Sequence, residues 1–488
     1  MKRLGATGLV AAAAAALLSG CAAGPDYVRP EVPTPAAFKE GVGWKVAQPQ
    51  DAALRRDWWK MFGDPQLDAL IAQVDVSNQN VRLAEAQWRQ AVGVVQQARA
   101  GLFPTLSLNN TDTRSRSPSL ANAPVTSTAA VSVYSLSLNA SWAPDFWGGV
   151  RRTVEGDVAN AQAGAADVAN ARLLAQAQLA LDYFQLRAVD AQRQLLRDTV
   201  AAYSKSLELT RNRYAAGVVA KVDVVQAETQ VKSTQAQAID LGVQRAQLEH
   251  AIAILIGKPP AELAIAPLSL NAALSAVPVE IPSELLQRRP DVASAERRMA
   301  AANAQIGVAT AAYYPSITFS GATGYRGSAW SQLLSAPNRF WSVGAAIGEA
   351  IFDAGARGAV VDQAKAAHDA SVASYRQTVL TAFQQVEDNL AALRILEEEA
   401  AAQDDAVKAA RESTELTLNQ YKAGTVSYLN VIIIQAAQLN NEAAAVRIQG
   451  QRLAATVALI QALGGGWDAS DLAEADSPSP RPASSAAR

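Results

Sequence analysis

Tyr134-Ser135-Leu136-Ser137-Leu138-Asn139-Ala140-Ser141-Trp142 is the stretch that decides the fold of this chain. Over these nine residues an apolar or aromatic side chain alternates with serine or asparagine without a break. A β-strand points successive side chains to opposite faces, so one face of this strand is apolar and the other is polar. A tilted strand of about 9–11 residues also spans the hydrocarbon core of a membrane. The pattern therefore predicts a membrane-spanning strand whose apolar face meets lipid.

Three other stretches show the same alternation, and we expect strands at about 103–113, 131–142, 315–326 and 340–351. A face of a soluble β-sandwich would alternate in the same way, but strands isolated between very long helices have no second sheet to join. Aromatic residues lie near the strand ends, where a membrane barrel carries its aromatic girdles. They are Trp142, Trp147, Tyr313, Tyr314 and Trp341.

Four strands in one chain cannot close a membrane barrel, because the smallest transmembrane barrels have eight strands. An open sheet edge in lipid would leave backbone groups without hydrogen-bond partners. The barrel must therefore be shared between chains, and two, three or four copies satisfy this argument equally.

The chain repeats itself after about 210 residues, a far longer period than that of solenoid repeats. Phe103-Pro104-Thr105 returns as Tyr314-Pro315-Ser316, and Tyr214-Ala215-Ala216-Gly217 returns as Tyr421-Lys422-Ala423-Gly424. We therefore expect two copies of one unit, residues 65–257 and 283–465, joined by a linker or equatorial segment at 258–282.

Each unit contains two long helices, expected at about 151–213 and 222–257 in the first copy and at about 355–421 and 428–463 in the second. Apolar residues recur in steps of three and four, the spacing of a coiled-coil seam. One seam runs through Ala177, Leu181, Phe184, Ala188, Ala191 and Leu195, and a second through Leu196, Val200, Tyr203, Leu207 and Thr210. Two seams indicate helices with neighbours on both sides, as in a wall of helices, whereas a plain two-stranded coiled coil needs only one.

The N-terminus carries Lys2 and Arg3, a short apolar run, and then Leu18-Ser19-Gly20 before Cys21. This layout predicts a signal peptide at residues 1–20. The position of Cys21 predicts that its thiol is acylated and becomes the new N-terminus, so that residues 21–64 form a lipidated, extended segment. The alternative is an ordinary secretory signal followed by a chance cysteine.

Composition excludes several classes of function. Cys21 is the only cysteine, so no disulfide can form within the chain. The 43 basic and 45 acidic residues leave no basic excess that would attract nucleic acid. His250 and His368 lie on separate helices, and we expect no metal site, no cofactor other than the lipid and no catalytic set, hence no enzyme. The polar tail at 466–488 has the composition of a disordered segment.

Taken together, the chain resembles the TolC-like outer-membrane efflux proteins, in particular their lipoprotein branch, often labelled NodT or OprM-like. The resemblance runs from Cys21 to about Trp467. Its marks are Cys21 with Gly24-Pro25-Asp26-Tyr27-Val28-Arg29-Pro30, Trp58-Trp59, Asp64-Pro65-Gln66-Leu67, Arg288-Arg289-Pro290-Asp291-Val292, the Tyr-x-x-Gly turns and Ala462-Leu463-Gly464-Gly465-Gly466-Trp467.

The resemblance implies a mainly α protein with membrane β-strands: a homotrimer with a twelve-stranded β-barrel in the outer membrane, continued by a long periplasmic α-helical barrel. It implies a passive, gated duct that exports small molecules such as drugs or other toxic compounds. Its partners would be outer-membrane lipid, a periplasmic adaptor and an inner-membrane pump, usually of the resistance-nodulation-division type.

The resemblance also assigns residues at the periplasmic mouth. Asp223 and Tyr421 would form a clasp between helices, and the turns at Arg213, Tyr214, Gly217, Gln420 and Gly424 would contact the adaptor. Leu429, Ile433, Val222 and Gln226 would form the periplasmic gate. Many relatives carry acidic residues at the positions of Asn430 and Ile433, so the run Val431–Ile434 predicts an apolar aperture that closes by dewetting.

Other functions stay open from the sequence. Within the duct class, metal-ion efflux or protein secretion are alternatives to the export of small molecules. A periplasmic adaptor would need a domain of many short strands, which the sequence does not suggest. A structural coiled-coil lipoprotein would leave the strands and the duplication unexplained.

Overall fold

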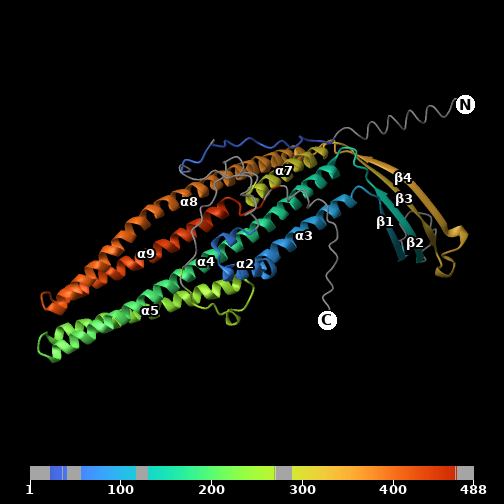
Figure 1. The fold of residues 1–488 in the computed structure, drawn as a ribbon. Helices are drawn as coiled ribbons and strands as arrows, with labels where there is room; N and C mark the ends of the chain where they lie inside the picture. The colour runs from blue at the N-terminus through green and yellow to red at the C-terminus, as the bar shows by residue number, and fades with distance from the viewer. Residues whose placement is uncertain are drawn as a thin grey trace. The chain divides into compact units, whose positions relative to one another are not determined.

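The computed structural model describes residues 22–35, 37–40, 57–116, 130–268, 270, 288–467 and 469. Cys21, the expected signal at 1–20 and almost all of the expected tail at 466–488 lie outside the described residues. The main elements, followed in Figure 1 from blue to red, are α2 (Pro65–Ser77), α3 (Gln79–Ala100), β1 (Thr105–Ser115), β2 (Val131–Trp142), α4 (Gly149–Ala215), α5 (Lys221–Leu255), α7 (Pro290–Ala311), β3 (Ser316–Gly327), β4 (Arg339–Gly348), α8 (Ala356–Ala423) and α9 (Tyr428–Ala462).

The chain forms two compact units. Among the described residues, the first unit takes those within 1–30, 89–163 and 296–374, and the second takes those within 31–88, 164–295 and 375–488. Each unit therefore contains segments from both halves of the internal repeat.

The first unit contains one four-stranded antiparallel sheet with the strand order β1-β2-β3-β4 (Figure 1). β2 belongs to the first repeat and β3 to the second, and they pair directly, with Leu138 opposite Thr323. The two repeats are thus joined through the backbone of a single sheet.

The strand register puts the apolar residues of all four strands on the same face of the sheet. Leu108 lies opposite Leu138, Trp142 opposite Phe319, and Ile317 opposite Ile347, and residues directly opposite each other share one face of an antiparallel sheet. Large side chains of this face are exposed; they are Leu106, Leu108, Leu138, Trp142, Phe319, Trp341, Val343 and Ile347. Serine, threonine and glycine dominate the opposite face. The alternation seen in each strand is therefore one continuous apolar surface of the sheet.

Strand β4 is shorter than the sequence predicted. We expected a strand at 340–351, but β4 ends at Gly348. Gly348 lies opposite Ser316, the first residue of β3, so residues 349–351 have no partner strand with which to form a ladder.

Similar corners lead from a strand into a long helix in both repeats. In the first, the Asp145 carboxylate accepts hydrogen bonds from the Val150 and Arg151 amides at 3.0 and 2.8 Å. In the second, the Asp353 carboxylate accepts from the Gly355 amide and, at 2.6 Å, from Nε of Arg357. A carboxylate at a helix N-terminus satisfies free amides and interacts favourably with the helix dipole.

The second unit contains α5, α9 and the parts of α4 and α8 that follow residues 163 and 374. These helices form two hairpins, α4–α5 and α8–α9, in which each helix folds back along its partner (Figure 1). The helix α2 packs on this unit: Phe62, just before it, contacts Phe184 with ring centres 4.7 Å apart, and Asp64 at its N-terminus accepts a 2.5 Å hydrogen bond from Tyr183. In the described part of the chain, no helix combines the length and the apolar composition needed to cross a membrane.

Candidate functional site

The two hairpin turns have the same backbone geometry. Val218 N donates to Arg213 O at 2.9 Å, and Gly217 N donates to Tyr214 O at 2.9 Å. In the second hairpin, Thr425 N donates to Gln420 O and Gly424 N to Tyr421 O, both at 3.0 Å. These pairs of bonds are those of a Schellman motif, which ends a helix by satisfying its last carbonyls.

The glycine in each turn is required by its backbone conformation. Gly217 has φ +71° and Gly424 has φ +80°, in the left-handed region that side-chain-bearing residues rarely adopt. The recurring Tyr-x-x-Gly pattern of the sequence is therefore the signature of this helix end.

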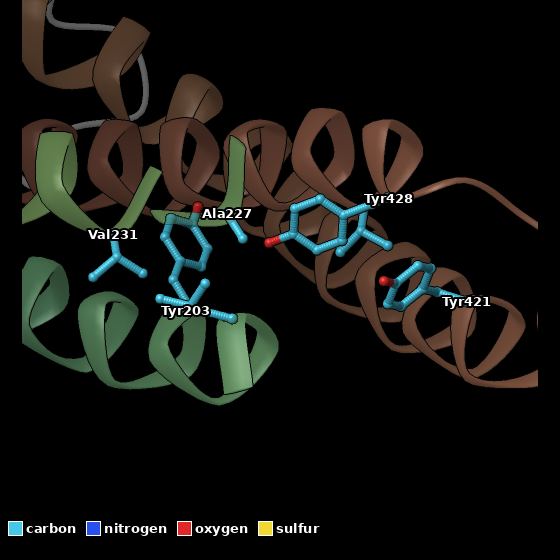
Figure 2. Packing of buried hydrophobic residues seen from close by; sticks show 7 residues of the cluster. Tyr203, Ala227, Val231, Tyr421 and Tyr428 are labelled. Atoms are coloured by element: carbon cyan, nitrogen blue, oxygen red, sulfur yellow. The ribbon is translucent and has the colours of Figure 1, made fainter. Parts of the chain in front are cut away.

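Next to the turns, all four long helices contribute to one apolar cluster, shown in Figure 2. Tyr203 of α4, Ala227 and Val231 of α5, Tyr421 of α8 and Tyr428 of α9 are its labelled members. Tyr421 and Tyr428 are each 2 % exposed, and their ring centres lie 5.4 Å apart. We call these residues, with Leu207 and Val431, the tip cluster. The cluster holds the two hairpins together.

Polar contacts cross between the hairpins inside this cluster. The Tyr203 hydroxyl donates to the carbonyl of Gln435 at 3.0 Å, and the Gln435 amide donates to Ser206 Oγ at 3.2 Å. The side-chain oxygen of Gln435 is buried without a hydrogen-bond partner. The hairpins are thus joined partly through polar groups, one of which, the side-chain oxygen of Gln435, is left without a partner at an energetic cost.

The Asp223–Tyr421 clasp expected from the resemblance does not form in this structure. The Tyr421 hydroxyl lies 3.3 Å from Thr210 Oγ1, on α4, instead. The carboxylate of Asp223 affects Tyr428 instead. Burial is the largest cause of the raised pKa of the Tyr428 hydroxyl, and the neighbouring Tyr421, Tyr203 and Asp223 raise this pKa further. In place of the expected hydrogen bond between Tyr421 and the Asp223 carboxylate, the structure has a contact between the hydroxyls of Tyr421 and Thr210.

Arg213 lies beside the first turn and also contacts the other hairpin. Its guanidinium lies 4.6 Å from the centre of the Tyr421 ring and donates a hydrogen bond to the Tyr421 carbonyl. By contrast, Tyr214 and Gln420, also expected at the adaptor-contact turns, are exposed.

The expected gate residues lie on the faces of α5 and α9 that the tip cluster leaves uncovered. Val222, Leu429 and Ile433 are each more than half exposed. Gln226 and Leu429 line the same cavity of about 510 Å³ between α5 and α9, whereas Val222 and Ile433 are not among its lining residues. The exposed large side chains Val222, Val225, Leu429 and Ile433 carry no charge.

Tyr203, Leu207 and Thr210 were predicted to lie on a helix seam, but their contact with the region of the turns was not predicted. Tyr428 and Gln435 were not singled out, although Tyr428 follows the second turn immediately. Within the described ranges, no three His, Cys, Asp or Glu side chains come together in a group that could hold a metal ion.

An exposed apolar sheet face and paired long hairpins that end in a shared tip cluster define a membrane channel protein with a helical extension. Residues 70–258 and 281–465 match the family described as outer membrane efflux protein. The chain belongs to this family, and it is an efflux channel of the outer membrane with a long periplasmic helical part.

Relatives match over almost the whole chain. The toluene efflux pump outer membrane protein TtgC of Pseudomonas putida and the antibiotic efflux pump outer membrane protein ArpC of the same species are each 34% identical over 461 residues, covering 93% of this chain and 95% of the relative. The solved structure of the outer-membrane channel OprN has a TM-score of 0.85 and 31% identity, covering 92% of this chain and 100% of the other. The expected family, fold class and outer-membrane location are thereby confirmed.

Proposed function

We propose that this chain forms a homotrimeric, passive duct that exports small organic molecules and closes at an apolar constriction beside the hairpin turns. The observation that carries the proposal is the four-stranded sheet, whose apolar face is exposed and whose edge strands β1 and β4 each pair with one strand only among the described residues. Such a sheet is compatible with lipid only if other copies continue it, and three copies make a closed barrel of twelve strands.

The gate in this proposal is apolar. Leu429 and Ile433 are one helical turn apart on α9, and Val222 and Gln226 have the same spacing on α5. Rings of such side chains around a narrow passage expel water, which stops ions without a charged barrier. The resemblance to the TolC-like proteins implies acidic residues at the positions that Asn430 and Ile433 occupy in this chain, so a cation-binding ring is not expected here.

The cargo and partners follow from the relatives. The names of TtgC and ArpC assign them to toluene and antibiotic efflux pumps, which supports organic compounds as the cargo of this chain. Metal-ion efflux or protein secretion is the alternative. The partners would be a periplasmic adaptor, seated on the turns at Tyr214, Gly217, Gln420 and Gly424, and an inner-membrane pump of the resistance-nodulation-division type. The pump supplies the energy, and the duct itself performs no catalysis and needs no cofactor beyond the lipid on Cys21.

Single-channel recording in planar bilayers tests this proposal. The native protein should give small, stepwise currents, and Leu429→Ser and Ile433→Ser should raise them severalfold because hydroxyl groups let water stay in the constriction. Ile239→Ser, an exposed apolar position farther along α5, is the matched control and should leave the conductance near the native value. A well-folded oligomer without any pore would refute the duct, and native currents limited by cations held at the turns would refute the apolar gate.

A further inference from the structure

The arginines of the sheet all lie at one end of it. Arg114 is the last but one residue of β1, Arg326 is the last but one of β3, and Arg339 is the first of β4. At their other ends these strands connect to the helices α3, α7 and α8, so the three arginines lie at the end of the sheet that is remote from the helices. Because the long helices are periplasmic, this end of the sheet faces the cell exterior.

The strand register separates Arg326 from the arginine beside it. Tyr325 lies opposite both Leu136 and Arg339, so Arg339 shares the apolar face of the sheet. Arg326 is the next residue along β3 and lies opposite Ser135, on the polar face. Two arginines that are nearly level in the sheet therefore point to opposite faces.

Arg326 is the only charged residue on the polar face of the four described strands. Arg114 lies opposite Ser132, and Asp112 lies opposite Tyr134. Both pairs belong to the apolar face, because Ser132 and Tyr134 are an even number of residues before Leu136 in the same strand. Asp112 is also the one acidic residue of these strands, so no carboxylate shares a face with Arg326.

The chain between the strands adds little charge near Arg326. Apart from Arg116, which directly follows β1, residues 117–130 and 328–338 contain no Asp, Glu, Lys, Arg or His. The guanidinium of Arg326 lies 5.3 Å from the centre of the Phe340 ring. Phe340 is opposite Gly324 and is therefore also on the polar face. A cation–π contact of this kind holds the guanidinium against the sheet without cancelling its net charge.

The consequence of this placement rests on the proposed trimeric duct, in which the apolar face meets lipid and the polar face lines the lumen. Rotational symmetry then places three Arg326 side chains in one ring at the outer exit. The remaining lumen-facing positions of the described strands are uncharged, so the ring dominates the electrostatic potential of this part of the lumen. A ring of positive side chains lowers the energy of an anion in a pore and raises that of a cation.

We propose that the Arg326 ring makes the exit of the barrel selective for anions. The duct then favours organic molecules that carry a carboxylate, sulfonate or phosphate group over organic cations. Arg326 is the selectivity-determining residue, and Phe340 positions its guanidinium at the wall. Arg339 faces lipid and takes no part in this selection.

The reversal potential of single channels in a potassium chloride gradient tests this selectivity. The recordings use the Leu429→Ser background, so that the periplasmic gate does not mask the exit. A dilute side of about 10 mM gives a Debye length of about 30 Å, long enough for the field of the ring to act across the lumen. Arg326→Gln should lower the chloride-to-potassium permeability ratio by about twofold or more, and Arg326→Lys should preserve most of it because the charge is kept.

Arg339→Gln is the matched control. It removes the same charge from the same end of the sheet, but from the opposite face, so the permeability ratio should equal that of the background channel. An unchanged ratio in Arg326→Gln would overturn the proposal. Equal changes in Arg326→Gln and Arg339→Gln would also overturn it, because the charge of the whole mouth, and not the ring, would then determine the selectivity.

Thiol modification gives a second readout that needs no ion current. Ser342 is exposed on the polar face of β4, two residues from Phe340, so Ser342→Cys places a thiol near the ring. In the full-length oligomer, an anionic methanethiosulfonate should modify this thiol faster, relative to a cationic one, when Arg326 is present. Arg326→Gln should lower this ratio of rates by about twofold or more. Mass spectrometry of the peptide that contains position 342 separates this label from any label on Cys21.

The two readouts distinguish a failure of this inference from a failure of the proposed duct. A well-folded oligomer that conducts no ions would refute the duct, and the ratio of modification rates would still decide whether Arg326 attracts anions to the polar face. An introduced thiol at position 342 that neither reagent modifies would overturn the inference, because the polar face would then not be in contact with water. A conducting channel whose two ratios are unchanged in Arg326→Gln would leave the duct standing and overturn the selective ring.

Discussion

The guanidinium of Arg213 lies 4.6 Å from the centre of the Tyr421 ring and also donates a hydrogen bond to the Tyr421 carbonyl. Arg213 belongs to the last turn of α4, and Tyr421 to the last turn of α8. One side chain therefore connects the ends of the two hairpins. Contacts at this place bear directly on whether the hairpins separate, because the buried tip cluster begins here.

Arg213→Gln should make the channel open more often. The substitution removes a cation–π contact and a charge-assisted hydrogen bond, together about 1–3 kcal/mol. If both contacts exist only in the closed state, the open-to-closed ratio rises by about fivefold or more. Dwell times in single-channel records measure this ratio.

Arg211→Gln is the control for loss of a positive charge near the turn. Arg211 pairs with Glu228 at 3.6 Å within one hairpin, and both side chains are about half exposed. Its dwell times should match the native ones. Equal effects of the two substitutions would mean that charge near the mouth, and not the contact with Tyr421, governs opening.

Tyr428 should ionise only at strongly alkaline pH. Burial raises the pKa of its hydroxyl, and the neighbouring Tyr421, Tyr203 and Asp223 raise it further. In the unfolded chain the pKa is about 10. The folded state therefore holds the proton more tightly, so the free energy of unfolding is unaffected below about pH 10 and falls above it by up to about 1.4 kcal/mol per pH unit.

The difference in tyrosinate absorbance between the native protein and Tyr428→Phe isolates this group. Its midpoint should lie well above pH 10 in the folded protein and return to about 10 in denaturant. A folded-state midpoint near 10 would show that the hydroxyl is in contact with water and that the tip cluster is open at rest.

Arg187→Met should destabilise the second unit by about 1–3 kcal/mol, since it removes one of the two arginines that pair with the buried Asp190 together with two further hydrogen bonds, while Arg245 still pairs with Asp190 at 2.8 Å. Arg187 pairs with Asp190 at 3.2 Å, both side chains being 3 % exposed, and donates to Gln66 Oε1 and Ala266 O at 2.7 and 2.8 Å. These bonds tie α2 and the segment after α5 to α4. Chemical denaturation of the oligomer measures the loss.

The control is Lys408→Met. Lys408 pairs with Asp405 at 2.9 Å, but the two side chains are 76 % and 79 % exposed, so the pair contributes less than about 1 kcal/mol. A comparable loss in both variants would show that the burial of Arg187 has no energetic consequence.

The sheet and the hairpins were predictable because their information is local. Alternation along Tyr134–Trp142 determines which side chains share a face, and the repeated Tyr-x-x-Gly pattern marks where a helix must end. Because the unit is repeated, both the strand pattern and the turn pattern occur in each copy, which strengthened each prediction. Within the site, Leu429 and Ile433 were assigned from the resemblance to the family, and their spacing of four residues puts them on one face of a helix.

The partner of the Tyr421 hydroxyl was not predictable in this way. Asp223 and Thr210 lie on two different helices of the opposite hairpin, and which of them Tyr421 meets depends on how far one hairpin is shifted along the other. A shift of about 5 Å, one helical turn, changes the partner without altering any helical pattern. The close approach of Ala22 and Ala23 to Gly148 and Gly307 was not predicted for a related reason: these two glycines are far apart in sequence, and each alone is an ordinary glycine.

Gly324→Ala should strongly reduce assembly of the channel. A Cβ at Gly324 of β3 would lie 2.1 Å from Leu136 O and 2.7 Å from Ser137 Cα, both backbone atoms of β2. The β2–β3 ladder is the only pairing that joins the two repeats within the described sheet, so blocking it divides the sheet into two hairpins. Isolated two-stranded hairpins are at best marginally stable. The amount of heat-resistant oligomer in outer-membrane fractions should fall severalfold.

Gly321→Ala, three residues earlier on the same strand, is the control. A Cβ at Gly321 has its nearest neighbour, Ser342 O, at 3.8 Å, so this variant should assemble at the native level. Normal assembly of Gly324→Ala would mean that β2 and β3 pair less closely than the register of Leu138 with Thr323 requires.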